Sequence, residues 1–271
     1  MNKLQFSVSM CVYGGDNAIY FREALESVYG QTRKPDEVVL VVDGPVTSEI
    51  NQVISDYETQ NDMKVFRLEK NMGHGIARAT GLKNCTYDYI AIADADDINR
   101  KDRFEKQMAM FEKDPSLSAI SSGCYHFVDS IDNILNEEKL PVTEAEVSKY
   151  IKKRCPLCQA STIFKKTDVE KVGGYIDWYC AEDYYLWIRL YENGYKLGNC
   201  PESLLYVRSD EEQMNRRGGY KYYKSMRDLF IYMYKHKIIN LVDLVYNVST
   251  RFVIQVMMTP SMRGFIRKHI L

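Results

Sequence analysis

The stretch Tyr89–Asp97, with the sequence YIAIADADD, decides how the rest of the chain is interpreted. Its first five residues are apolar or aromatic and predict a buried strand, and three carboxylates follow at once: Asp94, Asp96 and Asp97. Carboxylates this close together repel one another and cost free energy unless a cation lies among them. Oxygen ligands suit Mg²⁺ or Mn²⁺, which usually share their coordination shell with substrate phosphates. The segment therefore predicts a metal-binding strand end. The alternative is a solvated turn before a helix capped by Asp97 or Asn99.

Strands and helices alternate upstream of this segment. Apolar runs predict strands at 6–12, 37–42 and 64–68, and amphipathic or capped segments predict helices at 19–29, from 47 or 48 to 60, and at 76–83. This order indicates a parallel sheet, whose ligands gather at the carboxyl ends of the strands. Tyr13, Asp43, the loop 71–75 and the acidic turn at 94–97 all fall at that edge. We therefore expect an α/β fold with its binding site there.

The downstream half is less regular. It predicts a helix at 100–113, strands at 117–122, 125–128 and 158–164, a turn at 130–133 and a polar helix at 144–154. Glu182 and Asp183 then open a helix that runs to residue 191. Acidic residues in a first helical turn are favourable on dipole grounds alone, but a carboxylate placed there inside a site can also act as a general base.

Composition narrows the class of protein. The chain has 271 residues, no uncharged run long enough to span a membrane, and an N-terminus, MNKLQFSVSM, without the layout of a signal peptide. The seven cysteines do not have the spacing of a disulfide framework, which favours a reduced, cytoplasmic setting. Cys155 and Cys158 form a C-x-x-C pair that we interpret as ordinary thiols, with a zinc site as the alternative. The segment GHGIAR at 73–78 resembles part of a dinucleotide-binding fingerprint, but it follows the third strand, whereas such a fingerprint belongs after the first. Binding of NAD is therefore disfavoured.

The charge is distributed unevenly. Residues 215–271 contain eleven Lys or Arg and two acidic residues, a surplus of nine positive charges, so the first 214 residues of this chain of net charge −1 carry ten excess negative charges. A basic tail indicates an anionic partner, and the apolar positions of 238–258 fall on one helical face, interrupted by Asp243 and Arg251. Either the tail lies on a membrane surface or its helices pack on the body. Nucleic acid is disfavoured because no reading motif is present.

Several segments together resemble the GT-A glycosyltransferases of family two, in particular bacterial enzymes of O-antigen and exopolysaccharide (amylovoran-like) biosynthesis. The similar segments are 7–16, 27–45, 71–82, 90–107, 172–190 and 204–208. The resemblance implies a Rossmann-like, mostly parallel central sheet with flanking helices. It divides the chain into a catalytic domain at 1–214, with a nucleotide-sugar half to about residue 97 and an acceptor half from 98, and a basic amphipathic helical region at 215–271.

The resemblance also assigns roles to individual residues. Around the nucleotide sugar it places Val12, Tyr13 against the base, Asp43 reading uracil, Arg78 near the diphosphate, and Asp94, Ala95 and Asp96 of the D-x-D segment. Asp96 resembles the direct ligand of Mn²⁺ or Mg²⁺, with Asp94 toward the ribose or a metal-bound water. Asp183 matches the catalytic base and Glu182 its companion. The sequence departs from the family at Gln159-Ala160-Ser161, where a frequent H-P-T would contact the acceptor.

Together these features lead us to expect an inverting, metal-dependent hexosyltransferase. It would move a sugar from a UDP-sugar to a lipid-linked saccharide of the undecaprenyl-diphosphate type, at the cytoplasmic face of the inner membrane. A homo-oligomer is compatible with this expectation. One alternative is a sugar-phosphate nucleotidyltransferase, which would need a basic, glycine-rich loop after the first strand. The other is a non-catalytic subunit of a polysaccharide assembly complex that binds nucleotide sugar or membrane.

Overall fold

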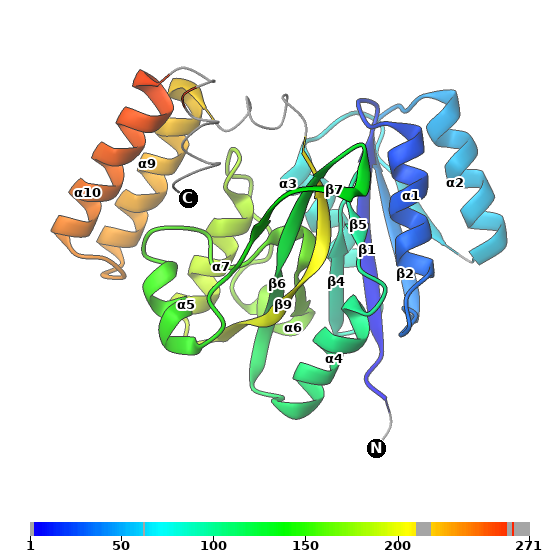
Figure 1. Ribbon diagram of the computed structural model, residues 1–271, viewed down its shortest axis with the longest axis horizontal. Coiled ribbons are helices and arrows are strands. Elements are labelled where there is room, and N and C mark those ends of the chain that lie inside the picture. Colours follow the sequence, from blue (N-terminus) through cyan, green and yellow to red (C-terminus); the bar gives the residue numbers. More distant parts are fainter. Residues whose placement is uncertain (1–2, 62, 210–217, 259–261, 263–271) are drawn as a thin grey trace.

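A computed structural model describes residues 3–61, 63–209, 218–258 and 262 of the protein. A mixed sheet forms its centre, with helices around it (Figure 1). The first half contains β1 (Phe6–Tyr13), α1 (Ala18–Tyr29), β2 (Glu37–Asp43), α2 (Ser48–Asn61), β3 (Lys64–Arg67), α3 (His74–Asn84) and β4 (Tyr89–Ala93). The alternation of strands and helices predicted for this half is confirmed.

The second half is built from shorter helices and two long strands. It contains β5 (Ile98–Asn99), α4 (Arg103–Lys113), β6 (Leu117–Val128), β7 (Ser130–Glu138), α5 (Glu144–Tyr150), the 3₁₀ turn η1 (Gln159–Ser161), β8 (Ile163–Lys165), α6 (Lys166–Lys171), α7 (Glu182–Glu192) and β9 (Lys196–Arg208). The strand order is β3-β2-β1-β4-β8-β6-β9-β5, and β7 pairs with β6. β8 runs antiparallel to both β4 and β6, so β6 and β9 point the same way as β1 to β4.

The alternation of side chains along the strands produces a core on each face of the sheet. In β4, Ala91 and Ala93 belong to a cluster completed by α1, α2 and α4, whereas Ile90 and Ile92 belong to a second cluster completed by α3, α7 and the C-terminal helices. Strand residues that alternate in this way contribute to both layers, as expected for a sheet covered on both sides. The α/β fold class is therefore confirmed.

Three predictions for the second half are wrong. The segments 117–122 and 125–128 form one strand, β6, with an irregularity between Ser122 and Cys124. The expected turn at 130–133 begins β7, all of whose residues are exposed. The expected strand at 158–164 is the turn η1 followed by the three-residue β8, because the hydroxyl groups of Ser121 and Ser161 bond the backbone of Cys158 in place of a continuous ladder. The long strand β9 was not predicted.

Among the residues described after β9, Gly219–Lys235 form α9 and Leu241–Phe252 form α10, which is continued by a π-helical turn at Val253–Met257. They lie side by side at one end of the molecule, beyond α5 and α7 (Figure 1). The predicted boundary between residues 214 and 215 lies outside the described residues. None of the described helices combines the length and the apolarity needed to cross a membrane.

Candidate active site

The acidic turn after β4 brings three carboxylates together. One oxygen atom from each of Asp94, Asp96 and Asp97 lies within 4.8 Å of the other two. Asp97 is 4% exposed, and burial together with the charges of Asp96 and Asp94 raises its pKa well above the ordinary value. The alternative role of Asp97 as a helix cap is wrong, because the residue before α4 is Asp102. Carboxylates that converge from a strand end in this way suit a hard divalent cation such as Mg²⁺ or Mn²⁺.

Arg78 is the cation beneath this turn. It extends from α3, is 1% exposed, and pairs with Asp94, while its other terminal nitrogen donates to the carbonyl oxygen of Ser9 in β1 at 3.3 Å. Burial alone would lower the pKa of this guanidinium, but neighbouring Cys11 and Asp94 raise it above the ordinary value. The side chain therefore balances part of the negative charge of the turn and fixes Asp94 against the sheet.

Arg208 holds the other end of the turn. At the last position of β9 its backbone N–H donates to Asp97 at 3.1 Å and its Nε donates to the carbonyl oxygen of Asp96 at 3.2 Å. Its guanidinium also pairs with Glu23 and lies 3.8 Å from the centre of the Tyr20 ring, both in α1. The turn is thus fastened from both sides before any ligand binds. Arg208 ended one of the family-like segments, but nothing in the sequence indicated this contact.

The loops after β1, β2 and β3 pack closely at the same edge. Gly44 has φ +84°, and a Cβ atom there would lie 2.5 Å from the backbone nitrogen of Asn71. Asp43, 5% exposed, accepts the backbone N–H groups of Met72 at 2.7 Å and Gly73 at 3.0 Å. Asp43 therefore holds the 71–75 loop in place, and its expected contact with uracil would come from lone pairs that these bonds leave.

Of the other residues expected around the nucleotide sugar, only the Tyr13 ring faces solvent. It is 39% exposed, beside Gly15, where a Cβ would come within 2.6 Å of the ring. Val12 and Ala95, by contrast, are buried in the first core cluster, 1% and 6% exposed. These two side chains shape the floor of the site, and a nucleotide contact there would have to use backbone atoms.

The second acidic position lies at the start of α7. Oε1 of Glu182 is 2.7 Å from Nδ1 of His74, the first residue of α3. Burial would raise the pKa of Glu182, but His74, and further off Arg78, lower it below the ordinary value. Asp183 accepts the N–H of Tyr184 at 2.6 Å through Oδ1, while the Cys155 thiol lies 4.0 Å from Oδ2. The Glu182 carboxylate thus connects the N-terminus of α7 to that of α3.

The two acidic positions are linked electrostatically through Arg78 and Tyr175. The phenol of Tyr175 is 8% exposed and accepts a hydrogen bond from Gln159 at 2.6 Å. Burial raises the pKa of this phenol; Arg78 lowers it, whereas Asp183 and Glu182 raise it. Arg78, which pairs with Asp94, therefore also contributes to lowering the pKa of Glu182 in α7. Residues from the turn after β4, from α3 and from α7, up to 105 positions apart in sequence, share one electrostatic environment.

Comparison with known proteins agrees with this geometry. The model of the family described as glycosyl transferase family 2 matches residues 7–172. The chain belongs to glycosyl transferase family 2. Over 267 residues this family 2 member is 37% identical to the UDP-Gal:alpha-D-GlcNAc-diphosphoundecaprenol beta-1,3-galactosyltransferase of Escherichia coli, a match that covers 98% of this chain and 96% of that protein. The amylovoran biosynthesis glycosyltransferase AmsE of Erwinia amylovora is 32% identical over 225 residues, covering 83% and 84%.

The fold of this family 2 glycosyltransferase is also found in a crystal structure of S. aureus TarS 1-349 in complex with UDP-GlcNAc. The two superpose with a TM-score of 0.69 at 19% sequence identity, covering 99% of this chain and 77% of the other. The GT-A fold and the family expected from the sequence are confirmed, and the protein is a glycosyltransferase. His74, Tyr175 and Arg208 are the residues of the site that sequence reasoning missed.

Proposed function

We propose that this glycosyltransferase moves a hexose from a UDP-sugar to a hydroxyl group of a lipid-linked, undecaprenyl-diphosphate-type saccharide, with inversion of the anomeric centre. The observation that carries the proposal is the group of three carboxylates in the turn after β4, where Asp94 pairs with the buried Arg78. A relative named for transfer to a diphosphoundecaprenol-linked sugar matches nearly the whole chain, which supports the acceptor class.

The donor end of the site is the carboxyl edge of β1, β2 and β4. Asp94 and Asp96 would hold Mn²⁺ or Mg²⁺, with Asp97 in the same group of carboxylates. Such an ion supplies neutralisation of the charge that develops on a diphosphate leaving group. Arg78 and Arg208 keep the turn in one conformation, so the carboxylates need not reorganise when the donor binds. Tyr13 offers an exposed ring for the base, and Asp43 an oxygen for uracil.

Asp183 is the proposed base. Its neighbour Glu182 is occupied by His74, whereas Asp183 is partly exposed at a helix N-terminus, where a carboxylate is stabilised in its charged form. An acceptor hydroxyl group that attacks the anomeric carbon must lose its proton, and a carboxylate on the side opposite the diphosphate can take it. Because a diphosphate leaves without protonation, a single displacement with one base suffices, and the configuration inverts.

The test is a panel of UDP-sugars offered with a synthetic GlcNAc-diphosphate lipid, with and without Mn²⁺, with the linkage of the product read by NMR. We expect transfer from one UDP-hexose, dependent on Mn²⁺ or Mg²⁺, with inversion. Asp183→Asn should retain donor binding in calorimetry and lose about a hundredfold or more in rate. Asp177→Asn, which removes an exposed acid of the preceding loop, should keep full rate. Loss of donor binding together with rate in Asp183→Asn would make that residue a donor ligand.

Neither alternative function has comparable support. A nucleotidyltransferase would need cations in the loop after β1, but that loop carries Gly14, Gly15 and Asp16. A non-catalytic subunit has no use for a buried arginine that balances an acidic turn beside a second acidic pair. Transfer activity in the panel above would exclude both alternatives at once.

We also propose that α10 rests on the membrane that carries the acceptor. The helix is oriented unusually, because two of its polar residues, Asn247 and Arg251, point inward. Asn247 is 4% exposed and donates to the carbonyl oxygen of Lys152 at 3.1 Å, and Arg251 donates to that of Lys153 at 2.8 Å. The outward face is apolar and consists of Leu241, Val242, Val245, Tyr246, Phe252, Val253 and Met257, between 40% and 76% exposed.

An apolar stripe of this kind suits the boundary between lipid headgroups and acyl chains. Of the apolar face predicted from the sequence, Leu244 and Val248 pack on the second core cluster, whereas Leu241, Val245 and Phe252 are exposed. The exposed residues Lys221, Lys224 and Lys235 lie on the neighbouring helix α9, and Lys237 lies in the turn between α9 and α10. Near an anionic surface each such charge contributes about 1 kcal/mol. The predicted contributors Arg216 and Arg217 lie outside the described residues.

Co-sedimentation with liposomes tests this contact. We expect binding to anionic vesicles that falls with salt but does not vanish, because the apolar face contributes a part that salt does not screen. The double variant Val242→Glu/Val245→Glu should abolish binding, whereas Leu135→Glu, which charges an exposed apolar residue of β7, should not. If the intact protein ignores vesicles of every composition, the apolar face of α10 serves another contact.

A further inference from the structure

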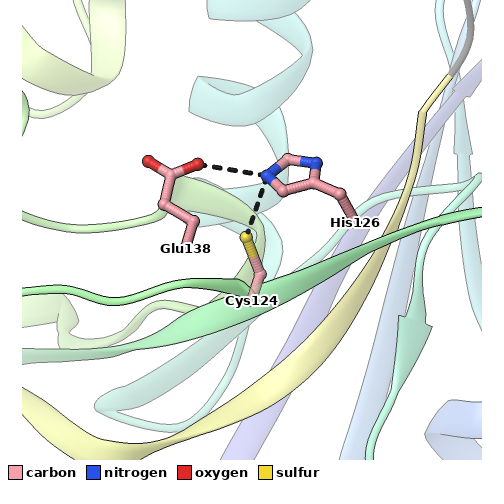
Figure 2. A group of neighbouring side chains, drawn as sticks. All are labelled: Cys124, His126 and Glu138. Carbon is pink, nitrogen blue, oxygen red and sulfur yellow. Dashed lines mark hydrogen bonds and ion pairs between the residues drawn. The ribbon is translucent and has the colours of Figure 1, made fainter. Parts of the chain in front are cut away.

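A second group of metal-ligating side chains lies on the β6–β7 hairpin, apart from the residues assigned to sugar transfer (Figure 2). Cys124 of β6 stands opposite Glu138 of β7, and His126 follows two residues later on the same face of β6. Nε2 of His126 is 3.6 Å from Sγ of Cys124 and 3.1 Å from Oε2 of Glu138. Cys124 and His126 are 3% and 6% exposed, whereas the Glu138 side chain is 48% exposed. The group is therefore buried on one side and open on the other.

These distances match the edges of a zinc coordination tetrahedron. With Zn–S of about 2.3 Å and Zn–N and Zn–O of about 2.0–2.2 Å, tetrahedral angles require S···N and N···O separations of about 3.6 and 3.4 Å. The observed S···N distance of 3.6 Å matches, and the observed N···O distance of 3.1 Å requires only a small outward shift of the half-exposed Glu138 side chain. Thiolate, imidazole and carboxylate together favour Zn²⁺ over the hard ions that suit the acidic turn.

The second nitrogen of His126 supports this reading. Nδ1 lies 2.9 Å from the hydroxyl oxygen of Ser209, directly after β9. When Nδ1–H donates to that hydroxyl group, Nε2 presents a lone pair toward the sulfur and the carboxylate, and a cation gives all three atoms a common partner. With the proton on Nε2 instead, the three side chains form an ordinary hydrogen-bonded group, which is the outcome to be excluded.

Cys158 is the nearby thiol. It packs, partly buried, against the small core cluster that contains Cys124. Cys155, the other half of the C-x-x-C pair, instead contacts the carbonyl oxygen of Leu157 and the carboxylate of Asp183. The sequence pair is thus divided between two places in the fold, and Cys158 lies by the cluster of Cys124, which is 34 positions earlier in the sequence.

We propose that Cys124, His126 and Glu138 bind one Zn²⁺ ion, with Cys158 as the candidate for the fourth position. The ion would fasten β7, which has no buried residue, to β6 at the end of the hairpin. Phe127, the neighbour of His126, pairs in the sheet with Arg208, which holds the acidic turn. The site is therefore structural, and it stiffens the region beside the donor site without contacting the reacting atoms.

The test uses the full chain, stripped with a chelator and titrated with Zn²⁺ by calorimetry, and with Co²⁺ to reveal thiolate ligation in the absorption spectrum. We expect one Zn²⁺ per chain, a thiolate–cobalt band, and a rise in the thermal unfolding midpoint with Zn²⁺. Cys124→Ser and His126→Ala should each weaken Zn²⁺ binding at least tenfold, and Cys158→Ser should do so if it supplies the fourth ligand. Cys200→Ser, a buried thiol of β9 outside the group, should leave the affinity unchanged.

Three results would overturn the proposal. The first is a wild-type protein that binds no Zn²⁺ at micromolar concentrations. The second is Co²⁺ binding without a thiolate band, a result that needs no variant to fold. The third is Zn²⁺ binding that survives Cys124→Ser but disappears in Asp96→Ala, which would place the ion in the acidic turn. Because none of these measurements uses sugar transfer, the proposed activity can fail while the zinc site stands.

Discussion

Replacing Arg78 by methionine removes the fixed counter-ion of the acidic turn while nearly preserving volume. Asp94 then loses a buried partner, and the carbonyl oxygen of Ser9 loses a donor. Removing one member of a buried ion pair costs about 3–5 kcal/mol, and because the Asp94 side chain is still 30% exposed we expect the lower end, about 3 kcal/mol. For a chain of this size that loss lowers the unfolding midpoint by roughly 6–12 °C.

The assay is thermal unfolding with and without Mn²⁺. A ligand at a hundred times its dissociation constant stabilises the folded state by about 2.7 kcal/mol. In Arg78→Met the turn carries the same three carboxylates without the arginine, so a divalent ion should bind more tightly. The same Mn²⁺ concentration should therefore raise the midpoint of the variant more than that of the wild type.

Arg189→Met provides the matched control. Arg189 is also buried, 6% exposed, but it donates to the backbone carbonyl oxygens of Val172 and Gly174 and to no carboxylate. Its loss should destabilise the protein and leave the response to Mn²⁺ at the wild-type value. The reasoning is refuted if Arg78→Met responds to Mn²⁺ no more than the wild type does, or if it unfolds at the wild-type temperature.

Three further predictions concern other parts of the sheet. Asp96→Ala should abolish turnover with the fold intact, since metal-assisted stabilisation of several kcal/mol is lost, and full activity of this variant or of the enzyme in EDTA would contradict the metal role. Asp43→Ala should weaken UDP binding by about 1–3 kcal/mol and reduce the preference for UDP over CDP in calorimetry; an unchanged preference would place the uracil reader elsewhere. Glu37→Gln should lower the free energy of unfolding by about 1.5–3 kcal/mol at pH 7, because the carboxylate accepts bonds from Lys64, Ser7 and Thr86. Burial would raise the pKa of Glu37, but these partners lower it from 4.5 to about 2. The carboxylate is therefore protonated as the pH falls from 4.5 toward 2. Over that range, the difference in free energy of unfolding between the wild type and Glu37→Gln, measured by denaturant unfolding, should shrink.

The elements that sequence reasoning found are those whose pattern is local. The run Glu37–Asp43 is apolar along its length, and it forms a strand buried on both faces. The strand β9 was missed because Gly198, Asn199 and Pro201 interrupt its apolar alternation, and its formation depends on pairing with β6, about 80 positions away. β7 shows no buried face at all, so only the hairpin partner explains why it is a strand.

The same distinction applies to the candidate site. The acidic turn was predictable because strand and carboxylates are adjacent in sequence. The role of Asp97 was not predictable. Instead of capping a helix, its carboxylate accepts a hydrogen bond from the backbone of Arg208, which lies 111 positions downstream. Likewise, Glu182 was expected as a companion of the base, but its pairing with His74 depends on two helices that begin 108 positions apart.

The position of β8 and β9 in the sheet bears on how the protein is made. Synthesis proceeds from the N-terminus, and early segments begin to fold as they emerge. β4 has β8 as its neighbour away from β1, so until residues 163–165 are available its outer edge has no native partner. The hydrogen bond that holds Asp97 in the acidic turn can form only after Arg208 has been synthesised. A nascent chain therefore presents an open strand edge, which is a template for mispairing, during the synthesis of about 70 residues. Fragments that end before residue 163 should be prone to aggregation however complete their nucleotide-binding half looks in sequence.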